Sequence, residues 1–404
     1  MARPSLRKIL AICYVGWMFD FYDLALFSFL IPSIGQEFKL SHEHEAWLLG
    51  IALGASGVGG ILFGWLADRV GRKPIMIWTI VLYSAGTTLS AFTHDPTTFF
   101  ILRALTGLGI GGEWAVGHAL VAESVPAERR GRAAALLQSG EPAGVALAAV
   151  MGLLLTPVIG WRAVMGISGV TALWALVVRR HLPESALWET KHGALAEEQR
   201  ARQWLRSGAG LWTFARSFLL ATFKLGTYWT CYIWLPKFLV SRFHEPVGRT
   251  ALWILTAQAG QFSGMMLFGR LADRIGRRYA YTIYSTVTAV ALALLAFDWE
   301  RLLETRPAFW ATMVLLGFGS GCTAGFGSLL SELFPTEVRN FAMGAAYNLA
   351  RGMQLFAPPV VAYFSVRYDI AGALSVPLGL AILTGAWVWT LPETRGRDLA
   401  KFSY

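Results

Sequence analysis

Residues 64–74 read GWLADRVGRKP, and residues 269–279 read GRLADRIGRRY. Each copy directly follows an apolar segment of helical length. A second pair of related stretches comes later in the same order: residues 122–131 read AESVPAERRG, and residues 331–340 read SELFPTEVRN. Because the two motifs recur in the same order and at nearly the same spacing, a single structural unit occurs twice in the chain.

The composition indicates that both units lie in a membrane. Of the 404 residues, 55% are hydrophobic and only 15% are charged, whereas a soluble domain carries about a quarter charged residues. The mean hydropathy is +0.49, and windows long enough to span a bilayer recur from end to end. The net charge of +10 comes from short basic clusters between apolar segments, which indicates membrane topology and excludes a nucleic-acid partner.

Apolar segments bounded by charged residues, proline or glycine lie on both sides of a polar stretch, six on each side. We expect an all-α integral membrane fold, with these segments as twelve transmembrane helices in two pseudo-symmetric six-helix bundles. The predicted spans are 9–34, 46–67, 74–93, 98–122, 132–156, 162–181, 212–240, 250–271, 279–297, 308–331, 340–364 and 371–391. The predicted domains are residues 1–182, a cytoplasmic linker of one or two short helices at 183–210, and residues 211–404. Lysine and arginine concentrate on one side of the spans, so both termini are predicted to be cytoplasmic.

The repeated motif resembles the signature of the major facilitator superfamily. Its pattern is G-x-x-x-D-R-x-G-R-[KR] after the second helix, and the second copy stands where that superfamily has one. RALTGLGIG at 103–111 resembles the superfamily's fourth-helix motif, and LPETRG at 391–396 resembles a motif common after the twelfth helix. The resemblance covers the whole chain and implies a multi-pass transporter of the plasma (inner) membrane that works by alternating access.

Two longer stretches narrow the resemblance. FDFYDLALFSFLIPSIG at 19–35 and GIGGEWAVGHALVAESVPAERRGR at 109–132 look like those of bacterial proton-coupled organic-acid symporters, the branch with sialate, lactate and other monocarboxylate carriers. That likeness implies symport of a small organic anion with protons. Aromatic-acid symporters share the fourth-helix pattern and sugar porters share the motif after the twelfth helix, so a proton-coupled sugar or zwitterion symporter and a drug or metabolite exporter stay open as alternatives.

Carboxylates inside the first unit are candidates for proton coupling, because a charge in a span is costly unless it is paired, neutralised or hydrated. Asp20 and Asp23 lie three apart on one face of the first helix, where their repulsion favours a proton on one of them. Glu113 lies near the middle of the fourth helix. Gln138 and Glu141 form another polar face on the fifth helix, where a structural hydrogen bond is at least as plausible as a proton-coupling role.

Basic residues inside the second unit are candidates for binding the substrate. Lys224 occupies the seventh helix at a position that corresponds to Asp20 in the repeat, and Arg351 lies in the eleventh helix. A guanidinium suits a carboxylate because it donates two parallel hydrogen bonds. The alternative for Arg351 is a permanent ion pair with an acidic residue of the first unit. Further predicted substrate-binding residues are Asn348, Tyr347, Tyr228, Gln258 and Gln261.

The loop motifs are candidates for gating residues. We expect Asp68 to cap the N-terminus of the eleventh helix, and Arg69 or Arg72 to reach Glu123 at the end of the fourth. The second unit repeats the arrangement with Asp273, Arg274, Arg277 and Glu332. These contacts are expected to hold one side of the transporter closed and to break when that side opens.

Other classes of protein fit the sequence poorly. The nucleotide-binding pattern G-x-x-x-x-G-K-[ST] is absent from the sequence, which argues against an ATP-driven pump. The three cysteines lie inside apolar segments, and neither they nor the seven histidines have metal-ligand spacing. We therefore predict a non-enzymatic protein without metal or cofactor, whose partners are a small organic anion, protons as the coupling ion and the lipid bilayer. One chain supplies both units, so a monomer suffices.

Overall fold

The repeated motif forms the turn between two helices in each half of the molecule. Gly71 and Gly276 have φ angles of 112° and 100°, which residues with a Cβ rarely adopt. Each glycine separates one long helix from the next, and this shared backbone geometry explains why both copies of the motif have glycine at this point. The motif therefore sets the direction in which the third span of each half leaves the second.

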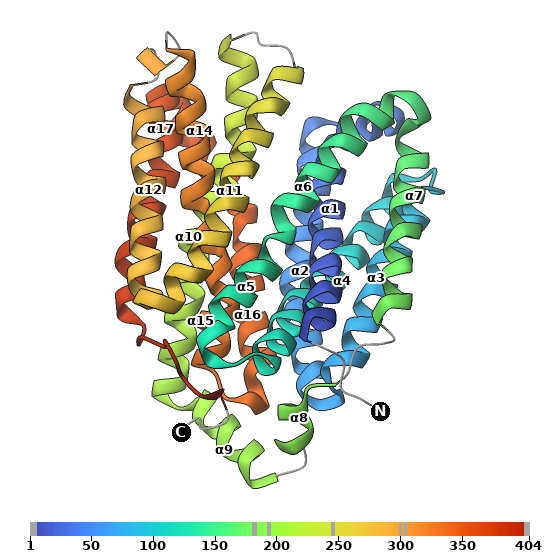
Figure 1. Cartoon of the computed structure of the whole chain (residues 1–404). Helices are drawn as coiled ribbons and strands as arrows, with labels where there is room; N and C mark the ends of the chain where they lie inside the picture. The colour runs from blue at the N-terminus through green and yellow to red at the C-terminus, as the bar shows by residue number, and fades with distance from the viewer. Residues whose placement is uncertain are drawn as a thin grey trace.

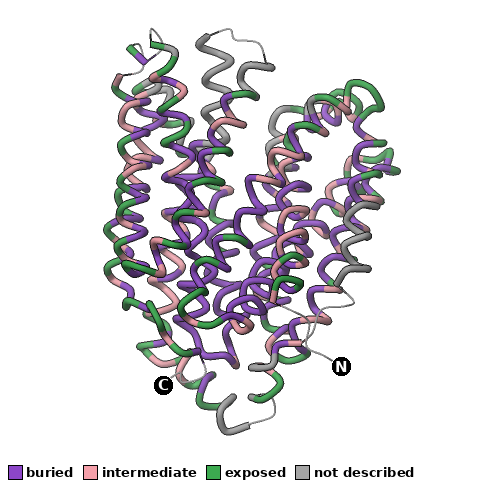
Figure 2. Tube along the Cα trace, viewed as in Figure 1, coloured by how far each residue is buried: buried purple, intermediate pink, exposed green. Residues whose placement is uncertain are grey.

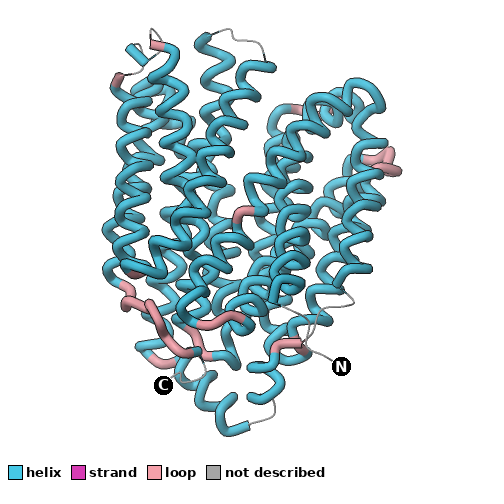
Figure 3. Tube along the Cα trace, viewed as in Figure 1, coloured by secondary structure: helices cyan, strands magenta, loops and turns pink. Residues whose placement is uncertain are grey.

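The computed structural model describes residues 6–179, 184–191, 195–243, 247–298, 301–302 and 305–399. Within these ranges the chain is helical apart from short turns and loops, and it contains no strand (Figure 3). The all-α prediction is confirmed.

The first half consists of six spans. They are α1 (Leu6–Phe38), α2 (His42–Val70), α3 (Arg72–Ser90), α4 (Pro96–Ser124), a broken fifth span and α7 (Thr156–Arg179). The fifth span is built from η1 (Ala127–Arg129), α5 (Arg130–Gln138), α6 (Gly140–Val150), η2 (Met151–Leu155) and the first turn of α7. The chain turns into the sixth span at Gly160, where φ is 79°.

The second half repeats this order. After α8 (Ala186–Lys191) and α9 (Leu195–Arg206) in the predicted linker come α10 (Gly208–Phe243), α11 (Val247–Ile275) and α12 (Arg277–Phe297). The tenth span is α14 (Arg306–Ser320), η3 (Gly321–Ala324) and α15 (Gly325–Leu333), and the eleventh starts with η4 (Thr336–Val338), α16 (Arg339–Gly352) and η5 (Met353–Phe356). The last elements are α17 (Ala357–Trp387) and η6 (Val388–Thr390).

The element α17 holds the end of the eleventh span and the whole twelfth. A Cβ on Gly372 would lie 2.4 Å from the carbonyl oxygen of Phe364, although eight residues of straight helix extend about 12 Å. The chain therefore reverses between these two residues. With this reversal, all twelve predicted spans are present as helix in the described part of the chain.

The two halves meet at one end of the molecule. This end carries α8, α9 and residues 391–399, and it is called the linker end below (Figure 1). The two bundles lean together there and diverge toward the opposite, far end (Figure 1). Close contacts join α2 to α16 and α5 to α11: a Cβ on Gly64 would lie 2.6 Å from the Asn340 carbonyl oxygen, and one on Gly269 would lie 2.6 Å from the Ala135 Cβ. Buried residues are concentrated along this junction (Figure 2).

The outer surface fits a hydrocarbon environment. Seven helical segments of the described chain are long and apolar enough to cross a membrane: Leu6–Ile31, Gly50–Val70, Pro96–Ser124, Ala127–Val150, Arg277–Phe297, Pro307–Leu333 and Ala371–Thr390. Large apolar side chains such as Phe92, Val158 and Phe297 are more than two thirds exposed. In a bilayer these side chains contact lipid rather than water.

Candidate functional site

Arg351 is a buried cation at the junction of the halves. It occupies the last turn of α16 and has 0% exposure. Its three guanidinium nitrogens have no acceptor in hydrogen-bonding geometry among the described residues, although the Tyr347 hydroxyl interacts with the guanidinium electrostatically. Three aromatic rings surround the guanidinium, with its central carbon 5.1 Å from the ring of Tyr347 and 5.6 Å from the rings of Trp17 and Phe21. Trp17 and Phe21 belong to α1, so the rings come from both halves.

Lys224 is a second buried cation of the same half. It lies in α10 and is 2% exposed, and its Nζ has no acceptor in hydrogen-bonding geometry among the residues that the structure describes, although the Cys322 thiol interacts with it electrostatically. Burying a charge costs several kcal/mol unless other groups compensate it. Both Lys224 and Arg351 interact electrostatically with Glu141 of α6. The site thus holds two cations and one carboxyl at the point where the halves meet.

A chain of polar side chains holds the Glu141 carboxyl. Gln138 donates from its Nε2 to Glu141 Oε2 at 2.9 Å, and Gln261 of α11 donates to Oε1 at 3.0 Å. The Gln138 Oε1 accepts from Trp114 Nε1 at 3.1 Å and lies 2.9 Å from His118 Nε2. The helix breaks after Gln138 because a proline ring four residues later clashes with its carbonyl, and this break places the amide and the carboxyl next to each other.

Aromatic and amide contacts close the site toward the linker end. The ring of Trp114 stacks on Tyr347 with centroids 3.7 Å apart and planes 9° apart. Asn348 donates to the Gly111 carbonyl oxygen at 2.9 Å, and its side chain fills the space that a Cβ on Gly60 would need. Asn348 therefore packs between α16, α2 and α4, whereas its neighbour Tyr347 lies against Arg351. Asn348 and Tyr347, which were predicted to share a face with Arg351, therefore have different roles: Asn348 packs the helices together and Tyr347 contacts the guanidinium.

The acidic residues predicted for proton coupling lie within the first half. Asp23 accepts a hydrogen bond from Thr87 at 2.6 Å and forms an ion pair with Arg103 at 3.1 Å. Glu113 accepts from the Thr79 hydroxyl at 3.3 Å, and Asp20 is fully buried in α1. Asp23 therefore has a cation of its own in α4, and Arg103 was not among the predicted site residues.

The remaining predicted substrate-binding residues are also buried. Tyr228 lies one turn after Lys224 in α10 and contacts Trp229 edge-on, with centroids 5.6 Å apart. Gln258 is 3% exposed in α11, one turn before Gln261, and its Oε1 accepts no hydrogen bond from the described residues.

The first gating cluster joins α2, α3 and α4 to α16. Asp68 accepts from the backbone N–H of Asn340 at 3.3 Å and of Phe341 at 2.9 Å, and from the Asn340 side chain at 2.9 Å. This is the expected cap on the eleventh span. Arg72 reaches Glu123 at 3.2 Å. The structure adds Arg339, which contacts the same Glu123 oxygen at 2.6 Å from the other half.

The second gating cluster repeats the first with the halves exchanged. Asp273 accepts from the backbone N–H groups of Gly131 and Arg132 at the start of α5, at 3.0 and 3.1 Å. Arg277 binds Glu332 at 2.9 Å, and Arg130 reaches Glu332 from the first half at 3.2 Å.

Two of the predicted gating residues stand apart from these clusters. Arg69 stacks on Trp65, with the guanidinium carbon 3.9 Å from the ring centroid, and Arg72 makes the contact with Glu123 instead. Arg274 lies exposed at the end of α11 and forms no ion pair with the described residues.

The sequence analysis overlooked a third repeated contact at the linker end. Glu184 accepts from the backbone N–H groups of Arg72 and Lys73 at the start of α3, and Glu393 accepts from those of Arg277 and Arg278 at the start of α12. Burial raises the pKa of Glu393, but four backbone N–H groups lower it further, so the carboxyl stays below its ordinary pKa. The matching sequences are PES at 183–185 and PET at 392–394, and this repeat was the available signal.

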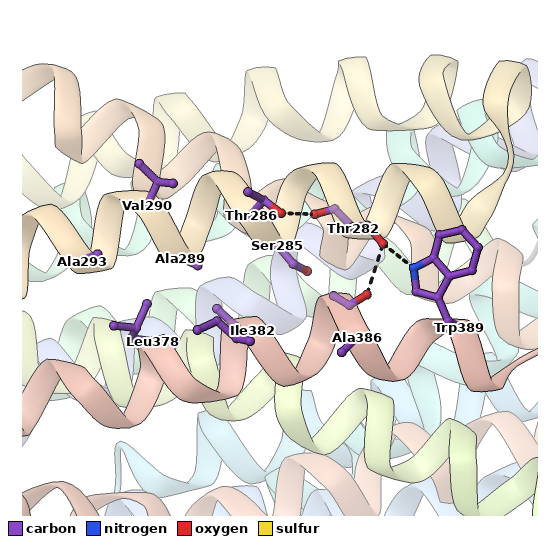
Figure 4. A pocket seen from close by; sticks show the side chains of 12 residues that line it. Thr282, Ser285, Thr286, Ala289, Val290, Ala293, Leu378, Ile382, Ala386 and Trp389 are labelled. Carbon is purple, nitrogen blue, oxygen red and sulfur yellow. Dashed lines mark hydrogen bonds between the residues drawn. The ribbon is translucent and has the colours of Figure 1, made fainter.

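A groove of about 620 Å³ lies between α12 and α17 on the outside of the second half (Figure 4). Its lining is mostly small and apolar, and the Trp389 Nε1 donates to the Thr282 hydroxyl at one end. No charged residue and none of the predicted site residues lines it. The groove is therefore separate from the buried cations.

Comparison with known proteins identifies the family. The model of the Major Facilitator Superfamily matches residues 13–257 and 246–402. The chain belongs to the major facilitator superfamily. Members of this superfamily with similar sequences are transporters, so the chain is a transport protein and not an enzyme.

Two relatives and one solved structure show the extent of the similarity. The chain is 32% identical over 97% of its length and 92% of the relative's to the "Probable 4-methylmuconolactone transporter" of Cupriavidus pinatubonensis strain JMP 134. It is 28% identical to the sialic acid transporter NanX of Escherichia coli strain K12, over 93% and 91% of the two chains. The proton:xylose symporter XylE matches with a TM-score of 0.85 over 98% of both chains at 18% identity, which shows a shared fold.

Proposed function

We propose that the protein is a secondary active transporter that carries a small organic anion together with protons by alternating access. The observation that carries this proposal is the pair of buried cations, Arg351 and Lys224, that make no hydrogen bond with the described residues. A carboxylate of the substrate would supply the missing acceptors. The relatives support an organic acid, because one is a sialic acid transporter by name.

The surroundings of Arg351 favour a substrate with one carboxylate and an apolar or planar remainder. The planar guanidinium offers a carboxylate two parallel hydrogen bonds. The rings of Trp17, Phe21 and Tyr347 surround the same guanidinium and have flat, apolar faces. A cationic drug would be repelled by the two positive charges, which argues against a drug exporter.

Proton coupling is proposed because buried carboxyls accompany these cations. An anion that binds Arg351 or Lys224 competes with the carboxyls of the site for the same positive charge. A buried carboxylate that loses its counter-charge gains a proton. Asp20, Asp23 and Glu113 were predicted for this role, and Asp23 is already compensated by Arg103.

Alternating access is proposed from the two gating clusters. They connect the halves at the linker end through ion pairs and helix caps, which can break and re-form. The far end lacks comparable contacts in the described residues, since its ion pair between Glu37 and Arg162 lies within the first half. We further propose that the linker end faces the cytoplasm, that the membrane is the plasma (inner) membrane, and that a monomer is sufficient.

The test is uptake into proteoliposomes with an imposed inward proton gradient. Labelled lactate, pyruvate, sialate, benzoate and muconate are compared for the wild type, Arg351→Ala and Asp20→Asn. We expect gradient-driven uptake of at least one acid, and its loss in Arg351→Ala. Uptake of a sugar or a zwitterion and of none of the acids would contradict the proposal and make Arg351 a structural residue.

A further inference from the structure

Glu141 is the carboxyl that lies beside the two buried cations, and both halves of the transporter hold it. It is 2% exposed in the first turn of α6. One carboxylate oxygen accepts from Gln138 of its own half, and the other accepts from Gln261 of α11 in the second half. Asp23, by contrast, accepts a hydrogen bond from Thr87 of α3 and pairs with Arg103 of α4, both in the first half.

The charged groups near Glu141 are mostly positive. Lys224 of α10 and Arg351 of α16 interact with it electrostatically, as does the Tyr347 hydroxyl. From α5, α11 and α4 the neighbours are the amides of Gln138 and Gln261 and, beyond Gln138, the His118 ring. From α1, which packs on α6 around Gly140 and Gly144, the facing residues are Tyr14, Trp17, Met18, Phe21 and Tyr22. The same helix carries Asp20 and Asp23, and Asp23 is paired with Arg103.

The net charge of the site stays constant if one carboxylate at a time serves the two cations. With Glu141 ionised, the set of Lys224, Arg351 and Glu141 has a net charge of +1. When a monocarboxylate enters and Glu141 takes one proton, the net charge is again +1. Loading the anion without the proton would bring a second carboxylate beside the first, and the repulsion between two neighbouring carboxylates favours a proton on one of them. Loading the proton alone would leave two buried cations without a counter-charge, which is costly in a low dielectric.

We propose that Glu141 is the proton-carrying group of the transport cycle, and that its carboxylate and the substrate's carboxylate alternate as counter-charge for Lys224 and Arg351. This inference rests on the proposed function. The proton arrives from the solvent side that is open, binds the Glu141 carboxylate as the anion takes over the cations, and leaves to the other side when the anion departs. No bond other than this O–H bond forms or breaks.

The contact with Gln261 connects this exchange to the movement of the halves. Gln261 belongs to α11, which moves with the second half, whereas Gln138 and Glu141 belong to the first. Movement of the halves changes the distance between the Gln261 amide and the Glu141 carboxylate, and a carboxylate that accepts this hydrogen bond binds a proton less readily than one that does not. The protonation state of Glu141 is thereby tied to which end is open.

The experiment compares Glu141→Gln with the wild type in proteoliposomes that contain a pH-sensitive dye. The five labelled acids named above are the probes, and Glu37→Gln at the far end is the matched control. For one proton per anion, the wild type accumulates its acid about tenfold per unit of imposed pH difference. We expect Glu141→Gln to exchange labelled for unlabelled acid, but to accumulate none and to carry no protons inward. Acid binding to the variant should be independent of pH, whereas binding to the wild type should strengthen as the pH falls.

Each other outcome is informative. Accumulation and proton entry in Glu141→Gln at the wild-type level would overturn the inference while leaving the proposed function intact. Loss of exchange in a folded Glu141→Gln protein would overturn it too, because Glu141 would then be a binding residue. If the wild type accumulates no acid, the proposed function fails first. If Glu141→Gln does not fold, Gln261→Ala is the second variant, because it keeps the Glu141 carboxyl and removes one of its donors. Uptake by Gln261→Ala should be half-maximal at a higher pH than uptake by the wild type. An unchanged dependence of uptake on pH would contradict the inference.

Discussion

Replacing Asp68 with asparagine should weaken the closed linker end without touching the substrate site. Asp68 accepts three hydrogen bonds from Asn340 and Phe341 across the junction. An asparagine has one carbonyl oxygen and no charge: with that oxygen in the Oδ1 position it keeps the two bonds from Asn340 in weakened form, and its amide N–H then faces the N–H of Phe341. A hydrogen bond to a charged group contributes about 1.5–3 kcal/mol, and an asparagine oxygen that stays bonded recovers part of that. We expect a net loss of about 2–3 kcal/mol, which is a factor of roughly 30 to 150 in the equilibrium between closed and open.

Spin labels on each half measure this equilibrium directly. Glu128 and Ile275 are exposed at the linker end, one in each half, and cysteines there can be labelled selectively because the three native cysteines are buried. In the wild type, double electron–electron resonance should show mainly one short distance. Asp68→Asn should add a second, longer distance. The control is Asp95→Asn, the same change in an exposed helix cap at the far end, and it should leave the distances unchanged. A distance distribution identical to the wild type in Asp68→Asn would refute the gating role.

Three further predictions concern stability. Asp23→Asn leaves the buried Arg103 without its counter-charge and should cost about 3 kcal/mol or more, so an unchanged melting temperature in detergent would contradict the ion pair. Gly111→Ala would place a Cβ 2.0 Å from a carbonyl oxygen of α2, so thermal unfolding should occur several degrees lower, and an unaffected variant would show that α2 and α4 are packed more loosely. The hydrogen bond from Arg162 lowers the pKa of Glu37. The stabilisation from this ion pair is therefore present above the ordinary glutamate pKa of about 4.3 and is lost as the pH falls through the lowered pKa. The melting temperatures of the wild type and Glu37→Gln should differ at pH 7 and converge in acid. A difference that does not change with pH would contradict this.

Much of the fold was predictable because it depends on local signals that repeat. Span length, apolar composition and the paired motifs are readable without three-dimensional information, and the same holds for Asp68 and Asp273, whose positions before each G-R turn place them beside the opposite half. The repeat could also have revealed Glu184, because it stands in the first half where Glu393 stands in the second.

The details of the substrate site were not predictable, because they depend on which helix faces which. Helical spacing placed Asn348 beside Arg351, but the close approach of α2 turned its amide toward Gly111. Nothing in the local sequence indicates that Trp114 stacks on Tyr347 of the other half. From the sequence, a structural hydrogen bond was at least as plausible for Glu141 as proton coupling, and the contact with Gln261 shows that it bridges the two halves.

The most direct test of the account is calorimetric binding of the transported acid and of its uncharged amide to the wild type and to Arg351→Ala. The account predicts that the acid binds, that the amide does not, and that Arg351→Ala weakens binding of the acid about 30-fold or more, as expected for the loss of a charge-assisted pair that contributes about 2 kcal/mol. Equal binding of acid and amide, or unchanged affinity in a folded Arg351→Ala protein, would show that the buried cations do not hold the substrate.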